Sequence, residues 1–281
     1  MSSDTYEQTE TDLDAVIPRE GWHVIHLFYR LELSQWAFYT DEERLEAKTD
    51  LSELVQDIRS EESTQLLTFS IVTPKADIGF MLLTDDLHKA NDFEKLLTRS
   101  LGPDVLTPVY SYLSMTELSE YTTTEEQYAE QLVEEEGVAK GSEELATKLE
   151  EFRTRMKKYN SDRLYPNMPD WPVFCFYPMG KRRGEQHNWY YLDFETRRKL
   201  MLGHARVGRT FAGRVRQLIT GSTGLDESEW GVTLFAHNTQ DIKEIVYEMR
   251  FDEVSSLYGD FGDFYIGLQL PLDELFRRVG L

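Results

Sequence analysis

The sequence has little of what a disulfide-bonded or membrane-spanning protein needs. Its 281 residues include a single cysteine, Cys175, so neither a disulfide within the chain nor a multi-cysteine metal cluster can form. No window approaches the roughly 18 uncharged apolar residues of a membrane span. The opening stretch, MSSDTYEQTETDLDAV, is acidic and polar, unlike the basic start and apolar run of a signal peptide. These absences predict a cytoplasmic protein that does not enter a membrane.

Positive charge is also scarce, and it is unevenly placed. The chain has 30 Lys and Arg against 51 Asp and Glu, a net charge of −21, which disfavours binding to nucleic acid. Yet residues 177–216 hold ten Lys or Arg and only three acids, a net charge of +7. A basic island in an acidic chain predicts an anionic ligand. The alternative is a patch that binds an acidic loop or a partner subunit of its own kind.

The hydrophobic pattern predicts the same βαββαβ order twice. The content of 40% hydrophobic and 12% aromatic residues is enough for a real core. In the first half, strands are expected at 22–31, 64–74, 77–86 and 106–118, with helices at 40–60, where Thr40 and Glu43 have capping-box spacing, and at 87–100. In the second half, strands are expected at 173–179, 211–221, 230–237 and 261–270, with helices at 193–206, where Asp193 is expected as the N-cap, and at 239–254.

This repeat predicts an α+β protein with two ferredoxin-like units. Each antiparallel sheet has one face covered by helices and a second apolar face, so packing of the two sheets into a β-barrel-like core, the dimeric α+β barrel, is expected. The predicted organisation is an acidic flexible tail (1–20), an N-terminal unit (21–120), an acidic helical connector (121–170) and a C-terminal unit (171–281).

Two residues of the basic island are candidates for chemistry. His204 lies one turn after Leu200 and Met201 on the apolar stripe of its helix. It is either a hydrogen-bonded core histidine or a metal ligand; a zinc site would need further ligands, whereas haem needs one. Gln217 shares strand parity with apolar residues, so its amide either bonds backbone at a sheet edge or faces a ligand cavity.

The strand before the island carries a second group of candidates. Tyr177 shares parity with Cys175 and Met179, and Lys181 follows directly. A tyrosine in a buried strand is usually a core residue. Cys175 is expected to be an inert core residue and not a thiolate ligand.

The joint spacing of these residues resembles a known family. The segments CFYPMGKRR, RRKLMLGH, GRTFAGRVRQLITGSTGL and YEMRFDEVSSLYGDFGDFYIG resemble the chlorite dismutase-like haem proteins, specifically their coproheme decarboxylase branch. The resemblance is dense from Arg163 to Gly267 and only topological in the first half.

The resemblance implies a role for each candidate. It makes His204 the proximal iron ligand and places Gln217 at the distal position, where true chlorite dismutases carry arginine. It makes Tyr177 the residue that forms a radical and Lys181 a neighbour of a reactive propionate. Other implied cofactor-binding residues are Met179, Arg163, Ser255 and Tyr121. An acceptor for the second nitrogen of His204 is expected, with Glu248 and Glu253 as candidates.

The implied activity is peroxide-dependent decarboxylation of two propionates of iron-coproporphyrin III (coproheme), which yields haem b. The implied assembly is a homopentamer. A substrate with four propionates explains why cationic groups gather in one segment. The alternatives are a haem carrier or sensor without activity, and a chlorite-degrading or peroxidase enzyme of the same family. A metal-free monooxygenase on a ferredoxin-like barrel is disfavoured by the combination of His204, Tyr177 and the basic island.

Overall fold

The computed structural model describes residues 14–281. The strands are β1 (His23–Leu31), β2 (Thr64–Ile71), β3 (Ile78–Thr84), β4 (Leu106–Thr116), β5 (Val173–Lys181), β6 (Val215–Gly221), β7 (Trp230–Ala236), β8 (Gly259–Phe261) and β9 (Tyr265–Gln269). The helices are α1 (Leu33–Trp36), α2 (Asp41–Ser60), α3 (Leu87–Arg99), α4 (Glu125–Glu134), α5 (Glu143–Leu164), α6 (Phe194–Arg209), α7 (Thr239–Phe251), α8 (Glu253–Tyr258) and α9 (Leu272–Val279), with a short 3₁₀ helix η1 at Trp189–Tyr191.

The strand order confirms two ferredoxin-like units. The first half pairs in the order β4-β1-β3-β2 and the second in the order β6-β7-β5-β9, all antiparallel. The two sheets join edge to edge, at β2–β9 through Phe69 and Gln269 and at β4–β6 through Thr116 and Thr220. Both junctions, together with the pairing of β5 and β7, close a ring rather than two separate stacked layers, and β8 pairs with the end of β5 on the same side as β9. Closure leaves few free strand edges.

Aromatic side chains fill the inside of the ring and tie its halves together. The rings of Phe69 and Phe174 stack at 3.9 Å, and those of Phe28 and Tyr265 at 4.1 Å. His26 also points inward, where it stacks on Phe176 at 4.0 Å and bonds the Thr233 hydroxyl through Nε2 at 2.8 Å. Each of these contacts joins a residue of the first half to one of the second.

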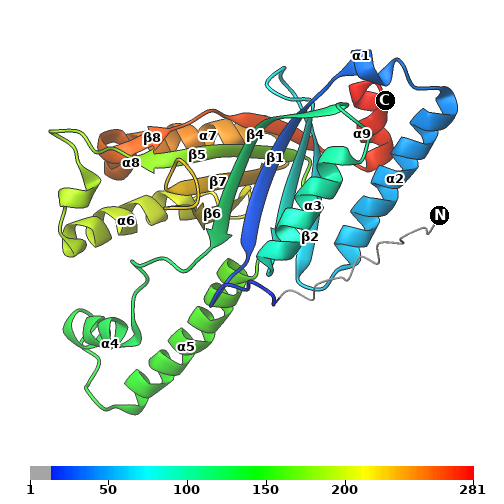
Figure 1. Cartoon of the computed structure of the whole chain (residues 1–281). Helices are drawn as coiled ribbons and strands as arrows, with labels where there is room; N and C mark the ends of the chain where they lie inside the picture. The colour runs from blue at the N-terminus through cyan, green and yellow to red at the C-terminus, as the bar shows by residue number, and fades with distance from the viewer. Residues whose placement is uncertain (1–13) are drawn as a thin grey trace.

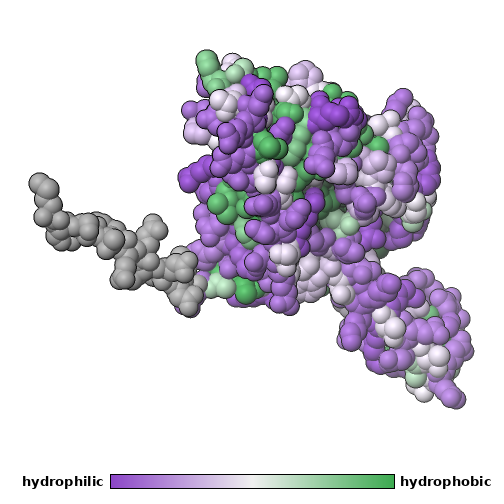
Figure 2. All heavy atoms as spheres, turned by 90° about the vertical axis from the view of Figure 1, so that its right-hand side faces the viewer, coloured by the Kyte–Doolittle hydropathy of each residue, from purple (hydrophilic) through white to green (hydrophobic). Residues whose placement is uncertain are grey.

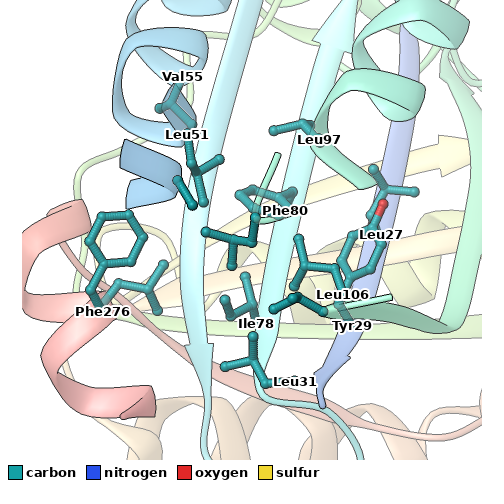
Figure 3. Packing of buried hydrophobic residues seen from close by; sticks show 14 of the residues in the cluster. Leu27, Tyr29, Leu31, Leu51, Val55, Ile78, Phe80, Leu97, Leu106 and Phe276 are labelled. Carbon is teal, nitrogen blue, oxygen red and sulfur yellow. The ribbon is translucent and has the colours of Figure 1, made fainter. Parts of the chain in front are cut away.

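The outer faces of the ring are covered by helices (Figure 1). In the first half, Leu51 and Val55 of α2 and Leu97 of α3 pack on Ile78 and Phe80 of β3 (Figure 3). The C-terminal helix α9 joins this cluster through its buried side chains, although its residues belong to the segment predicted as the C-terminal unit. In the second half, α7 packs on the sheet, and Val207 of α6 joins the same cluster.

Local signals explain why several elements begin where they do. The predicted capping box at Thr40 and Glu43 starts α2, and Asp193 caps α6 by accepting the Thr196 N–H at 2.8 Å. Three predicted bounds were wrong. The helix expected at 239–254 divides into α7 and α8, the strand expected from 211 starts at Val215, and the strand expected at 261–270 divides into β8 and β9.

The predicted connector forms an arm. Helices α4 and α5 extend from the body as a mostly hydrophilic lobe (Figures 1 and 2). A small cluster of Leu132, Val138 and Leu145 holds the two helices together. Of the predicted tail, residues 1–13 lie outside the described residues, while the Val16 N–H donates to Asp86 at 2.9 Å. No helix in the described part of the chain is long and apolar enough to cross a membrane.

Because His26 is buried inside the ring of strands, we expect the protein to lose stability at acidic pH. Burial lowers the pKa of His26 to about 3, so the folded chain keeps the ring neutral where the unfolded chain, with a pKa of 6.5, takes up a proton. Below pH 6.5 the parent should therefore lose about 1.4 kcal/mol of unfolding free energy per pH unit from this group. Urea unfolding at about pH 7 and about pH 5 should show a smaller acid loss in His26→Gln. The same acid loss in His26→Gln as in the parent would contradict this, and the exposed His237→Gln is the control.

Candidate functional site

The candidate residues of β5 face outward from the ring, beneath the helices of the second half. Tyr177 and Met179 alternate with the inward-facing Phe174 and Phe176, so they join the outer cluster with Ile245 and Met249 of α7. The predicted common face of Tyr177, Met179 and Cys175 is confirmed.

His204 is held by a carboxylate. Its Nδ1 lies 2.8 Å from Oδ2 of Asp252, whose side chain is 7% exposed. This pairing presents the opposite nitrogen, Nε2, as the one that can take a metal. The expectation of Glu248 or Glu253 as partner was wrong, because both side chains are exposed and Asp252 occupies that place.

The break between α7 and α8 explains why Asp252 reaches His204. Asp252 has an extended backbone (φ −68°, ψ 149°), and its Oδ1 accepts the Val254 N–H at 2.9 Å as the cap of α8. Burial alone raises the pKa of Asp252, but hydrogen bonds, chiefly that from His204, lower it overall. The carboxylate is therefore kept as an anion beside the imidazole.

Lys181 is a buried cation at the end of β5, with a relative exposure of 6%. Its Nζ lies 4.4 Å from the ring centre of Trp189 and 5.5 Å from that of Trp230. Burial lowers the pKa of Lys181 to about 8, against the opposing effect of Asp252 and Glu229. The ammonium is thus poorly hydrated and suited to an anionic partner.

Ser255 and Met179 lie next to Lys181. Gly259, which pairs with Lys181, is so close to both that a Cβ on it would lie 3.1 Å from the Ser255 Cα and 3.2 Å from the Met179 Cε. Ser255 is buried and its hydroxyl lowers the pKa of Asp252, yet Oγ has no partner with hydrogen-bond geometry among residues 14–281. Arg198 of α6 has a buried Nε that is likewise unpaired within this range.

Tyr177 and Gln217 occupy the same outer face as Met179. Tyr177 is buried, its ring stacks on Phe264 at 4.3 Å, and burial raises the pKa of its phenol, which stays protonated. The Gln217 Nε2 donates to the carbonyl of Gly208 at 3.2 Å. The backbone-bonding alternative therefore describes the amide here, with a helix carbonyl as the acceptor.

Helix α6 lies close to the sheet at Gly208, one turn after His204. A Cβ at this position would lie 3.0 Å from the Met249 Cε and 3.4 Å from the Gln217 Nε2. Glycine here lets the helix that carries His204 lie close to the strand that carries Gln217.

Tyr121 and Arg163 lie in different places. Tyr121 is buried with Trp189 and Val254, and its hydroxyl accepts from the Arg197 Nε at 3.2 Å. It therefore borders the group around Lys181. Arg163, in the last turn of α5, donates through Nε to the carbonyl of Glu117 at 2.7 Å, which ties it to the end of β4.

Four residues that contact His204 or Lys181 were not predicted from the sequence. They are Asp252, which pairs with His204, and Trp189, Trp230 and Glu229, which lie beside Lys181. A usable signal existed only for Asp252, since an aspartate followed by EVSS is typical of a helix start.

A shallow groove borders the site from the side of α7. Its lining includes Val246 and Arg250 of α7 together with Phe264, the ring that stacks on Tyr177. His204 does not line this groove, which thus reaches the neighbourhood of Tyr177 from outside the His204–Asp252 pair.

The buried ammonium should cost stability. The folded chain holds Lys181 with a pKa of about 8 against 10.5 when unfolded, so stability is reduced below pH 8 and rises as the pH increases between these values. Lys181→Met should therefore raise the unfolding free energy at neutral pH by about 1–3 kcal/mol. Denaturant unfolding tests this, with the exposed Lys199→Met as control. A less stable Lys181→Met chain would refute the expected cost.

Comparisons with known proteins show the family of the chain. The profile of the chlorite dismutase family matches residues 44–270. A coproheme decarboxylase of Staphylococcus carnosus is 38% identical over 92% of this chain and 97% of its own. A haem-binding protein of Thermus thermophilus is 35% identical, with a TM-score of 0.77 over 95% of this chain and all of its own. Chlorite dismutase of Candidatus Nitrospira defluvii shares the fold, with 16% identity and a TM-score of 0.68 over 94% of this chain and 97% of its own. The chain belongs to the chlorite dismutase family.

Proposed function

We propose that this protein catalyses the peroxide-dependent oxidative decarboxylation of two propionates of coproheme, giving haem b. The observation that carries the proposal is the placement of the His204–Asp252 pair near a buried lysine, Lys181, with Tyr177 on the same strand face. The coproheme decarboxylase of Staphylococcus carnosus, which is similar over nearly the whole chain, supports it.

The chain's own residues fit such a substrate. An imidazole oriented by a carboxylate is a common arrangement for a metal-ligating histidine. The Ser255 hydroxyl and the Arg198 Nε, unpaired within residues 14–281, are donors of the kind that carboxylates accept from. We therefore assign His204 to the iron, and Lys181, Ser255, Met179 and Tyr121 to the propionates and the porphyrin rim; the family resemblance alone adds Arg163 to this set.

The overall reaction sets what the residues must do. Each propionate, with one peroxide and one proton, becomes a vinyl group, carbon dioxide and two waters. Two electrons and one proton thus leave the side chain each time. Bound iron porphyrin supplies the redox chemistry, and the protein supplies position and charge.

Tyr177 and Lys181 divide the remaining work. The raised pKa of Tyr177 keeps its O–H, so the phenol is able to give up an electron and a proton together and recover them from a propionate. Lys181, with a pKa of about 8, is charged at neutral pH and attracts the propionate carboxylate. Their position on one strand face, with Met179 between them, puts both on the same side of the site.

The neutral side chain of Gln217 favours decarboxylation over chlorite degradation as the activity. Its amide is neutral, so it would offer a hydrogen bond near the porphyrin but no charge to hold an oxychlorine anion. The second candidate function is that of a haem carrier, because the similar protein from Thermus thermophilus is described as haem-binding. We further propose a cytoplasmic homopentamer, which the family resemblance supports.

The direct test combines spectroscopy and mass. Coproheme is added to the purified protein, peroxide is titrated, and conversion is followed by absorbance and by the mass of the extracted porphyrin. Loss of two carboxyl groups as haem b forms supports the proposal. Binding without conversion indicates the carrier, and sustained oxygen release from chlorite indicates chlorite chemistry; either result rejects decarboxylation as the main activity.

Removing the proposed iron ligand should weaken binding. His204→Ala leaves Asp252 in place but removes the nitrogen assigned to iron, so its affinity for coproheme should fall at least about tenfold and the ferric absorbance spectrum should change. Titration followed by absorbance measures both, with the exposed His237→Ala as control. An unaltered ferric spectrum in His204→Ala would remove the assignment.

Tyr177→Phe should separate binding from catalysis. Phenylalanine keeps the stack on Phe264 but has no O–H to give, and one lost hydrogen bond costs only about 0.5–1.5 kcal/mol. The variant should bind coproheme while decarboxylation falls by at least about a hundredfold. The exposed Tyr247→Phe is the matched control. Formation of haem b by Tyr177→Phe at the parent rate would disprove the relay role.

A further inference from the structure

A second buried carboxylate, that of Glu229, lies beside Lys181 and belongs to none of the roles assigned above. Its relative exposure is 5%, and it stands in the turn just before β7. One oxygen, Oε2, accepts the backbone N–H of Lys181 at 3.1 Å. The other, Oε1, accepts from the Tyr190 hydroxyl at 2.7 Å and lies 3.4 Å from the Arg183 guanidinium.

The Glu229 carboxylate serves as a hydrogen-bond acceptor for β5 just beyond the end of its pairing with β7. The ladder between β5 and β7 ends at Met179 opposite Trp230, two residues before Lys181. On its other side Lys181 pairs with Gly259 of β8. The Glu229 carboxylate thus accepts the Lys181 N–H on the side where β7 no longer accompanies β5. A buried N–H without a partner would be costly, so this acceptor fixes the end of the strand.

The same carboxylate holds the loop between β5 and α6 against the sheet. The loop includes η1, in which Trp189 is buried and Tyr190 is half exposed. Because Tyr190 is bonded to Glu229, its neighbour Trp189 is kept over the Lys181 ammonium at 4.4 Å. One side chain therefore sets both the backbone of Lys181 and the indole that covers it.

Gly180 makes this approach possible. A Cβ at this position would lie 2.8 Å from the Glu229 Oε2, which is closer than real Cβ contacts. The backbone of Gly180 is not in the left-handed region, so alanine meets no conformational penalty of its own there. Gly180→Ala is therefore a second way of displacing the carboxylate without removing it.

We propose that Glu229 is a positioning residue that holds Lys181 and its Trp189 cover where a carboxylate of the substrate binds, and that its charge keeps the Lys181 amine protonated. The part concerning the substrate rests on the proposed function; the part concerning Lys181 does not. Glu229 acts through Lys181 and is not assigned a contact with coproheme.

The charges around Lys181 determine in which direction its pKa should move when Glu229 is replaced. Two carboxylates act on the amine through their charge, Asp252 from the α7–α8 junction and Glu229 from the turn before β7. The two indole rings near the amine, those of Trp189 and Trp230, carry no charge. Both carboxylates raise the pKa of Lys181 against the effect of burial, so the loss of Glu229 leaves Asp252 alone to oppose it. The pKa of the amine should then fall below its value of about 8.

The first test uses the ligand-free protein and does not depend on activity. Tryptophan emission is titrated with pH, and the step that disappears in Lys181→Met is assigned to the ammonium near Trp189. In Glu229→Gln this step should move to lower pH by about one unit. Glu227→Gln, which removes a charge from the same turn, should leave it in place. An unmoved step in Glu229→Gln would overturn the proposal.

Two further variants keep the test decisive if Glu229→Gln folds poorly. Gly180→Ala should move the step in the same direction because it displaces the carboxylate. Tyr190→Phe releases the loop but keeps the charge, so it should alter the emission of Trp189 without moving the midpoint. A parent-like titration and emission in both variants would overturn the proposal as well.

The second test joins the inference to catalysis. The alkaline limb of the pH profile for coproheme decarboxylation should move to lower pH in Glu229→Gln by the same amount as the emission step. A moved emission step with an unmoved rate profile would reject the substrate part alone. If the parent protein does not decarboxylate coproheme, the proposed function fails, and the ligand-free titration still decides the role of Glu229.

Discussion

The arrangement of the whole molecule depends on aromatic packing inside the closed ring of strands. The stacks of Phe69 on Phe174 and of Phe28 on Tyr265 join the two halves through side chains rather than through the chain alone. Because residues alternate along a strand, filling the interior with Phe174 and Phe176 turns Tyr177 and Met179 outward. The inner face thus holds the halves together, and the outer face carries the candidate site.

The site on that outer face is organised by carboxylates that stand where regular structure stops. Asp252 lies at the break between α7 and α8 and pairs with His204, while Glu229 lies before β7 and accepts the backbone N–H of Lys181. Each satisfies a backbone N–H and also acts on a side chain of the site. This double use explains how an acidic protein keeps a histidine and a buried lysine in fixed places, since a charge removed from water needs a nearby partner.

Much of this could be predicted from residues close together in the sequence. Alternation predicted the common face of Tyr177 and Met179, and the capping residues Thr40 and Asp193 predicted the starts of α2 and α6. The choice of Glu248 or Glu253 as partner of His204 was wrong for a definite reason. It assumed one continuous helix, whereas the extended backbone of Asp252 redirects the chain and brings a different carboxylate to the imidazole.

The sequence by itself determined the class of fold, the common face of Tyr177 and Met179 on β5 and the family, because strand alternation, helix caps and motif spacing are local properties. Only the tertiary structure decided which groups meet: Asp252 with His204, Trp189 with Lys181, and Glu229 with the end of β5. The last pair is 48 residues apart in the chain. Contacts of this kind depend on where a strand ladder ends and how a loop folds back over it, and these follow from packing across the whole sheet rather than from any short segment.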